Sequence, residues 1–171
     1  MKEIIVAGGC FWGVEEYFRR IIGVVDTAVG YAQGHQQNVT YQEVCTQRTN
    51  HAEVVWIKYD EAQLSLIQVC EFLFRIIDPT SLNKQGNDVG NQYRVGIYPS
   101  SQAEVEIVKQ FLKEKQKAYQ KPLVVEVELV HNFQKAEDYH QLYLENNPHG
   151  YCHVDMNTLL NHEVKERYRK A

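Results

Sequence analysis

The residues best suited to do chemistry lie in one short stretch near the N-terminus, Gly8-Gly9-Cys10-Phe11-Trp12-Gly13. A cysteine at a helix start lies beside unpaired backbone N–H groups and the positive end of the helix dipole, and both favour the nucleophilic thiolate. We therefore expect Cys10 to ionise more readily than an ordinary cysteine. Phe11 and Trp12 place two large aromatic faces beside the sulfur, which suits a small apolar group held near a nucleophile. The alternative is that Cys10 is a small buried hydrophobe and its neighbours are ordinary core.

Two predicted elements would hold the Cys10 thiol in place. Residues 4–7 form a short, continuous and β-branched apolar run, which is typical of a buried strand. Val14 and Phe18 then recur at helical spacing, and Gly23 supplies a stop. The thiol is therefore predicted at a strand-to-helix corner, where the adjacent glycines let the chain turn tightly.

The rest of the chain predicts an α+β fold. Thr40 with Glu43, and Ser101 with Glu104, form capping boxes that open helices. The elements follow the order strand, helix, strand, strand, helix, strand of the split βαβ or ferredoxin-like unit. We expect a two-layer sandwich with that core, an extra helix and strand, and a coil or helical C-terminal tail. Further strands are predicted at 24–31, 52–59, 93–98 and 123–130, a short helix after residue 40, longer helices at 65–77, 101–119 and 136–145, a loop at 80–91 and a helical tail from 157.

The composition indicates one globular domain spanning residues 1–171. Hydrophobic residues make up 44% of the chain and charged residues 23%, and this length can bury a sizeable core. The net charge of -4 gives no reason to expect nucleic acid or an anionic membrane surface as partner. No apolar run approaches membrane-spanning length and no secretory signal is present, so we expect a cytoplasmic protein. The four cysteines are too widely spaced for a disulfide framework, which leaves structural or catalytic roles for the thiols.

The stretch Gly9-Cys10-Phe11-Trp12-Gly13 resembles the signature of the A-type peptide methionine sulfoxide reductases. Further matching segments follow in that family's order and cover nearly the whole chain. The resemblance implies a catalytic domain that reduces the S epimer of methionine sulfoxide, in proteins and peptides or free, with thioredoxin as external reductant. We expect no bound cofactor or metal, and a monomer. The matching segments are Gly30-Tyr31-Ala32, Thr40-Tyr41-Gln42-Glu43-Val44-Cys45, His51-Ala52-Glu53-Val54-Val55, Asp78-Pro79-Thr80, Gln85-Gly86-Asn87-Asp88-Val89-Gly90-Asn91-Gln92-Tyr93-Arg94, Ala136-Glu137-Asp138-Tyr139-His140-Gln141 and Gly150-Tyr151-Cys152.

The resemblance gives Glu53 the role of the acid. A sulfoxide is a poor electrophile until its oxygen receives a proton or strong hydrogen bonds. Glu53 lies among apolar strand residues, where desolvation would raise the pKa of the carboxyl and keep it protonated near neutral pH. Period-two alternation alone favours the opposite interpretation, in which Glu53 faces solvent. The resemblance favours the first, because the matching Glu of that family hydrogen-bonds the sulfoxide oxygen.

The resemblance also implies residues that bind the substrate. Tyr31 and Tyr93, in the second and fourth strand regions, would donate hydrogen bonds to the sulfoxide oxygen. Asp88 would hold the backbone N–H of the substrate methionine, and His140 is a further candidate for the same surface. The aromatic pair of the signature would form the pocket for the substrate methyl group. Considered alone, a tyrosine in a strand is more often a residue that packs in the core, and an aspartate in a Gly-flanked loop is a common turn residue.

A second thiol is needed after the first step. Attack by Cys10 would release methionine and leave a sulfenic acid on its sulfur. Cys152 matches the family's resolving position, in a C-terminal segment that begins near residue 146, and thioredoxin would reduce the Cys10–Cys152 disulfide. Cys70 lies on an apolar helix face and is predicted to be core, and Cys45 receives no catalytic role. Because no cysteine follows Cys152, we expect a two-cysteine cycle.

Two other classes of protein remain open on the residues alone. A hydrolase would use Cys10 as nucleophile and His51 or His140 as base, and it would not need Cys152. A non-enzymatic redox sensor would oxidise Cys10 and Cys152 to a disulfide without turning over a sulfoxide. Both alternatives make testable demands on the same side chains.

Smaller features complete the sequence picture. His149, Cys152 and His153 are a weak candidate for a metal site, because they are three ligands in one short coil without a fourth. Gln33 and Val39 stand where the resembled family usually has Gly and Pro. These departures lie in loops, and they affect substrate preference more than chemistry.

Overall fold

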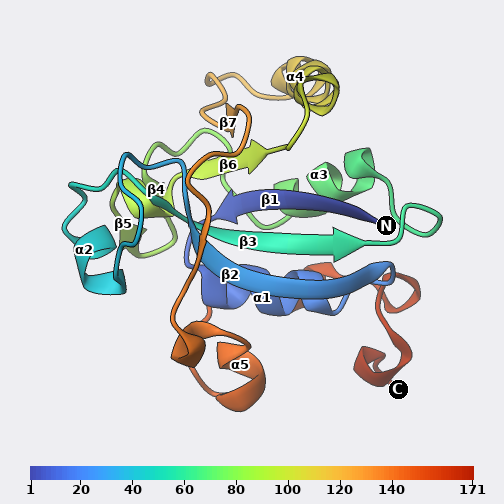
Figure 1. Ribbon diagram of the computed structural model, residues 1–171. Coiled ribbons are helices and arrows are strands. Elements are labelled where there is room, and N and C mark those ends of the chain that lie inside the picture. Colours follow the sequence, from blue (N-terminus) through green and yellow to red (C-terminus); the bar gives the residue numbers. More distant parts are fainter.

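The computed structural model describes residues 1–171, which form one six-stranded sheet with helices packed on it (Figure 1). The strands of this sheet lie in the order β7-β6-β1-β3-β2-β8, and two short strands, β4 and β5, form a separate hairpin. The strands are β1 (Lys2–Gly8), β2 (Val24–Ala32), β3 (Ala52–Tyr59), β4 (Lys84–Gln85), β5 (Asp88–Val89), β6 (Val95–Tyr98), β7 (Glu126–Val127) and β8 (Gln134–Lys135). The α-helices are α1 (Phe11–Arg19), α2 (Tyr41–Cys45), α3 (Leu66–Phe74), α4 (Gln102–Gln116) and α5 (Tyr143–Asn146).

The four central strands confirm the ferredoxin-like prediction. Their order is β6-β1-β3-β2, and each of the three pairings among them is antiparallel. Because β3 lies between β1 and β2, helix α1 connects two parallel strands that are split by a third, which is the split βαβ arrangement. The additional strand β7 pairs in parallel with β6, and β8 pairs with the far side of β2.

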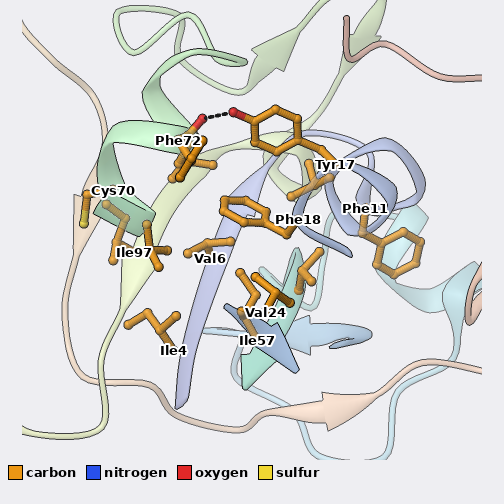
Figure 2. Packing of buried hydrophobic residues seen from close by; sticks show 14 of the residues in the cluster. Ile4, Val6, Phe11, Tyr17, Phe18, Val24, Ile57, Cys70, Phe72 and Ile97 are labelled. Carbon is orange, nitrogen blue, oxygen red and sulfur yellow. Dashed lines mark hydrogen bonds between the residues drawn. The ribbon is translucent and has the colours of Figure 1, made fainter. Parts of the chain in front are cut away.

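The main core lies between the sheet and the helices α1 and α3. Figure 2 shows Val6 of β1, Ile57 of β3 and Phe18 of α1 packed together, and each of these side chains is fully buried. Helix α1 is fastened to α3 by the Tyr17 hydroxyl, which donates a hydrogen bond of 2.7 Å to the backbone carbonyl of Phe72. The helix that follows Cys10 is therefore held against the sheet by packing and by a buried polar contact.

The opposite face of the sheet is also buried, which explains the continuous apolar run of the first strand. Ile4 belongs to the main core, whereas Ile5 and Ala7 belong to a smaller cluster that includes Val54 and Tyr98. The coil after β7 crosses this side from β6 to β2 (Figure 1), with backbone hydrogen bonds from Val130 to Pro99 and from Gln33 to His131. A strand covered on both faces does not alternate between apolar and polar residues.

Several elements are of the predicted type but differ from the prediction in length. The strand at 52–59 is confirmed, and the predicted capping box at Thr40 opens α2. The Ser101 side chain caps α4 by accepting from the Glu104 N–H, but the reciprocal hydrogen bond of a capping box is not formed. The predicted helix at 136–145 is wrong: residues Asp138–His140 form a 3₁₀ turn, and Leu142 adopts a left-handed conformation with φ of 51° before the single turn of α5. An α-helix cannot continue through such a residue.

The remaining differences lie in the loops and the tail. Only Glu126–Val127 of the predicted strand at 123–130 pairs in the sheet, and the predicted loop at 80–91 contains the β4–β5 hairpin. The tail forms three 3₁₀ turns, Met156–Thr158, Asn161–Glu163 and Glu166–Tyr168, in place of an α-helix. No helix is long and apolar enough to cross a membrane.

The C-terminal tail is fixed to the end of α1. Ile21 and Val164 form an isolated antiparallel bridge, and the Ile22 N–H donates to the Glu163 carbonyl at 2.9 Å. The Glu163 carboxylate accepts two hydrogen bonds of 2.7 Å from the Arg75 guanidinium. A bidentate pair of this kind fixes geometry as well as charge. The tail thus anchors the C-terminal end of the coil that bears Cys152.

Candidate active site

Cys10 lies at the corner between β1 and α1, as predicted, where it is the N-cap residue of the helix. Gly9 makes this corner possible, because its φ of 91° belongs to the left-handed region that favours glycine. A Cβ at Gly9 would also lie 2.9 Å from the Gln85 Cβ and 2.9 Å from the His153 Nε2. The thiol is 7% exposed, so it faces a nearly closed site.

The prediction that Cys10 ionises more readily than usual is not met in this state of the site. Burial raises the pKa of the Cys10 thiol above its ordinary value, and the nearby Glu53 and Asp88 carboxyl groups raise it further. The backbone N–H of Trp12, in the first turn of α1, lowers it. The helix terminus therefore acts in the predicted direction, and desolvation outweighs it.

Glu53 is buried beside the thiol, on β3. Its carboxyl is 2% exposed, and Oε1 accepts a hydrogen bond of 3.2 Å from the backbone N–H of Phe11, the residue after Cys10. Burial raises the pKa of Glu53 to about 8, while hydrogen bonds from Phe11 and Gln92 act against the shift. The structure thus places Glu53 inward, which contradicts the solvent-facing alternative, and burial favours its protonated form near neutral pH.

An aromatic wall borders the same corner. The Phe11 side chain is buried, and Trp12 stacks on Tyr143 with ring centroids 3.8 Å apart. The Trp12 Nε1–H donates a hydrogen bond of 3.0 Å to His140 Nδ1. These contacts fix the orientation of both aromatic residues of the signature.

His140 is buried behind this wall. Its ring lies 5.1 Å from that of Phe11, 4.7 Å from that of Tyr41 and 4.2 Å from that of Tyr139, measured between centroids. Burial lowers the pKa of His140, which keeps the imidazole neutral. Because Nδ1 accepts from Trp12, the proton resides on Nε2. The structure therefore gives His140 a direct role in orienting Trp12.

The tyrosines are arranged differently from the prediction. Tyr31 is the cross-strand partner of Glu53, but its hydroxyl donates a hydrogen bond of 2.7 Å to Glu137 Oε1. Tyr93 ends a 3₁₀ turn, Asn91–Tyr93, and is not part of a strand. Burial raises the pKa of its phenol, and Glu53 and Cys10 are among the groups that act on it. Both phenols are thus close enough to Glu53 to feel its charge, and the two differ in that the Tyr31 hydroxyl already donates to Glu137.

Sequence analysis missed Tyr41 as a site residue. Burial raises the pKa of its phenol, and both Glu53 and Cys10 contribute to the shift, so the hydroxyl lies near the reactive pair. The signal available in the sequence was its position at the start of the helix opened by the Thr40 cap, because the first turn of a short capped helix is held in a defined orientation.

Asp88, in the short strand β5, and Cys152, in a coil, belong to segments that approach the corner. The Tyr151 hydroxyl donates a hydrogen bond of 2.8 Å to Asp88 Oδ2. Cys152 is exposed, and a Cβ added at Gly13 would lie 3.1 Å from its Sγ. Cys10 and Gly13 are three positions apart and lie on one face of the first turn. The Cys152 sulfur therefore sits against the same helix face as the Cys10 thiol.

Two other candidate residues, Cys70 and His51, lie away from this cluster. Cys70 is fully buried in the main core, as predicted. His51 Nε2 contacts the Gln36 carbonyl at 2.7 Å, so its ring is committed to a loop. His153 Nε2 contacts the Gly8 carbonyl at 2.8 Å, and no group of three or more His, Cys, Asp or Glu side chains is arranged to hold a metal ion. The candidate metal site at His149, Cys152 and His153 is therefore not formed.

Comparisons with known proteins agree with this geometry. The sequence profile of the family described as peptide methionine sulfoxide reductase matches residues 2–171. The chain is 54% identical over 156 residues to the peptide methionine sulfoxide reductase MsrA of Ureaplasma parvum, which covers 91% of this chain and 94% of that protein. The structure of Mxr1 from Saccharomyces cerevisiae in reduced form superposes with a TM-score of 0.82 at 40% identity and covers 88% of each chain. Mxr1 in complex with Trx2 superposes with a TM-score of 0.58 at 28% identity, over 81% of this chain and 83% of that one.

The fold and these matches define the protein as an oxidoreductase. The chain belongs to the peptide methionine sulfoxide reductase family. Membership of this family overturns the hydrolase and non-enzymatic sensor alternatives.

The burial of Glu53 makes a prediction about stability and pH. Its pKa is about 8 in the fold and near 4.3 in an unfolded chain, so only the unfolded state ionises between these values. The wild type should therefore lose stability as pH rises from about 4 to about 8, relative to Glu53→Gln, which cannot ionise. As pH rises over this range, the free energy of unfolding of Glu53→Gln should increase relative to that of the wild type by on the order of several kcal/mol.

Urea unfolding of both proteins at several pH values would measure this gain. Glu61→Gln is the matched control, because Glu61 is exposed. A difference between wild type and Glu53→Gln that stays constant with pH would show that Glu53 is not held neutral by the fold.

Proposed function

We propose that this protein reduces the S epimer of methionine sulfoxide, free or in proteins and peptides, with Cys10 as nucleophile and Glu53 as acid. One observation carries the proposal: the neutral carboxyl of Glu53 is held by the Phe11 N–H, directly beside the thiol that caps α1. A nucleophile and a proton donor on two fixed elements are what the reduction of a sulfoxide requires.

The first step moves two electrons from the cysteine sulfur to the substrate sulfur. The Cys10 sulfur attacks the sulfoxide sulfur while Glu53 protonates or hydrogen-bonds the oxygen. The sulfur–oxygen bond of the substrate breaks, methionine leaves, and the oxygen stays on Cys10 as a sulfenic acid. Because Glu53 is neutral at this point, it does not repel the Cys10 thiolate, and the Trp12 N–H supports that charge.

Two phenols are positioned to assist Glu53 at the oxygen. Tyr93 and Tyr41 both lie near Glu53 and Cys10. A hydrogen bond from a preorganised donor becomes stronger as negative charge develops on the oxygen that accepts it. The Tyr31 hydroxyl is bound to Glu137 instead. We therefore assign Tyr41 and Tyr93 as oxygen donors and Tyr31 as part of the wall beside Phe11, whose ring centroid is 5.8 Å away.

The aromatic wall would select the epimer. Phe11 and Trp12 form an apolar surface for the substrate methyl group, and their orientation is fixed through His140 and Tyr143. With the methyl group on this wall, only one configuration at sulfur directs the oxygen toward Glu53. Asp88 would accept the backbone N–H of the substrate methionine through Oδ1, because Oδ2 is bound to Tyr151.

Cys152 would complete the cycle. Its sulfur lies over the first turn of α1, and attack on the Cys10 sulfenic acid would release water and form the Cys10–Cys152 disulfide. A dithiol protein of the thioredoxin type would then reduce this disulfide, so the reductant is external and no bound cofactor is required. The yeast relative Mxr1, whose structure has been solved in complex with Trx2, supports this partner.

The reaction and its epimer are tested directly with separated substrates. Wild type with dithiothreitol should consume the S epimer of a methionine sulfoxide peptide and leave the R epimer. Cys10→Ser should lose activity, and Glu53→Gln should lower kcat at least about 100-fold, because general acid catalysis contributes about 10²–10⁴-fold. Chromatography of the methionine product measures all three rates. Reduction of the R epimer, or full activity of Cys10→Ser, would refute the proposal.

The assignment of the oxygen donors is tested by removing single hydroxyl groups. Tyr41→Phe should lower kcat by about 10- to 100-fold, in the range of a lost oxyanion donor. Tyr31→Phe is the matched control, because it also removes a phenol hydroxyl, one that donates to Glu137, and we expect a smaller fall. Steady-state kinetics on the S-epimer peptide gives kcat for both. A larger loss in Tyr31→Phe would reverse the assignment.

The role of Cys152 is tested by changing the reductant. Cys152→Ser should yield about one methionine per enzyme with a thioredoxin system and then stop, because the sulfenic acid cannot become a disulfide. The same variant should turn over with dithiothreitol, a small thiol that reaches the sulfenic acid itself. Continued turnover of Cys152→Ser with thioredoxin at the wild-type rate would contradict the two-cysteine cycle.

A further inference from the structure

A cavity of about 450 Å³ has Cys152 in its wall. It lies between α1, α5 and the C-terminal tail, and its lining includes the Cys152 side chain and three arginines, Arg19, Arg20 and Arg167. This volume falls within the range of about 300–1,000 Å³ that is usual for small-molecule sites. None of the proposed steps at Cys10 uses this cavity.

The arginines are gathered on one ring. The guanidinium groups of Arg167, Arg20 and Arg19 lie 4.7, 5.3 and 5.8 Å from the centroid of Tyr168, which therefore holds three like charges close together. Glu16 pairs with Arg19 at 3.0 Å and with Arg20 at 2.7 Å.

The positive charge of the cavity is not fully balanced. Arg19 also reaches the Glu145 carboxylate at 3.4 Å, so two carboxylates face three guanidinium groups. Arg167 has no acidic partner, and the Nε of Arg19 is buried without a hydrogen-bond partner. An anionic ligand in the cavity would supply the missing acceptors.

The thiol in the wall of the cavity decides what kind of anion fits. Cys152 is exposed, whereas Cys10 is only 7% exposed, so an external thiol reaches the Cys152 sulfur of a Cys10–Cys152 disulfide first. A reductant that attacks this disulfide directly would therefore meet the Cys152 sulfur.

We propose that this cavity is a binding site for a low-molecular-weight thiol that carries carboxylate groups, of the glutathione type, which serves as a second reductant of the enzyme. The proposal rests on the proposed function, because it requires Cys152 to be the resolving cysteine. The carboxylates of the thiol would pair with Arg167 and Arg20, and its sulfur would face Cys152.

The exchange balances in two steps. The thiolate of the ligand attacks the Cys152 sulfur, the bond between Cys152 and Cys10 breaks, and Cys10 leaves as a thiolate that takes up a proton. A second molecule of the thiol then attacks the ligand sulfur of the mixed disulfide and releases Cys152. Two thiols lose two electrons and become a disulfide, and the enzyme disulfide gains these electrons.

The mixed disulfide can be formed without any sulfoxide, which separates this test from that of the reductase reaction. Cys10→Ser protein is treated with glutathione disulfide, which is anionic, or with hydroxyethyl disulfide, which is neutral. Peptide mapping by mass spectrometry gives the rate of adduct formation at Cys152 and, as an internal reference, at Cys45, which is also exposed. We expect the preference for glutathione over hydroxyethyl adducts to be about tenfold greater at Cys152 than at Cys45.

Two further measurements assign the preference to the arginines. Arg167→Gln should reduce the preference at Cys152 about fivefold or more, and added salt should reduce it in the unaltered cavity. Arg169→Gln is the matched control, because Arg169 does not line the cavity, and it should leave the preference unchanged. Equal preferences at Cys152 and Cys45 would overturn the proposal, and so would an unchanged preference in Arg167→Gln. The proposal would also fail if only a dithiol protein, and not glutathione, reduced the disulfide of the enzyme. A failed epimer assay with a retained adduct preference would refute the reductase mechanism and leave the anion site standing.

Discussion

The hydrogen bond between the Glu53 carboxyl and the Phe11 N–H is the constraint on which the site depends. It joins the central strand β3 to the first turn of α1, so the acid and the thiol cannot move independently. A carboxyl without its charge costs far less to bury than a carboxylate, and Glu53, on the central strand β3, is only 2% exposed. The low polarity that keeps Glu53 protonated also raises the pKa of Cys10. One environment thus produces the proton donor and restrains the nucleophile.

The elements around this hydrogen bond hold α1 in a fixed position on the sheet. Tyr17 ties the helix to α3, and the tail fixes its C-terminal end through Ile21 and Val164. At the other end, the ring of Trp12 is clamped between Tyr143 and His140. The helix therefore presents Cys10, Phe11 and the Cys152-facing surface of Gly13 as one rigid unit. Positioning of this quality comes from packing on regular elements, and loops alone do not provide it.

The sequence predicted the features that depend on local chemistry and failed where distant contacts decide. The β-branched run of β3 and the cap at Thr40 gave correct elements, because these signals are contained within a few residues. The helix predicted at 136–145 failed at Leu142, whose left-handed conformation is imposed by tertiary contacts, including the hydrogen bond from its N–H to Glu15. Site residues were found where a motif marks them, as with Glu53. The phenols could not be ranked from the sequence, because only the fold shows that the Tyr31 hydroxyl donates to Glu137.

The coil that carries Cys152 has a kinetic consequence for the protection of the enzyme. It is tied at one end to α5 and at the other, through Val164, to α1, so the thiol is confined to a small volume above the first helical turn. Confinement of this kind corresponds to a local thiol concentration in the millimolar range or above. A sulfenic acid on Cys10 would meet this thiol before a second molecule of oxidant. In the proposed cycle, tethering would guard Cys10 against irreversible conversion to sulfinic acid, so that the enzyme stays active under the oxidising conditions that create its substrate.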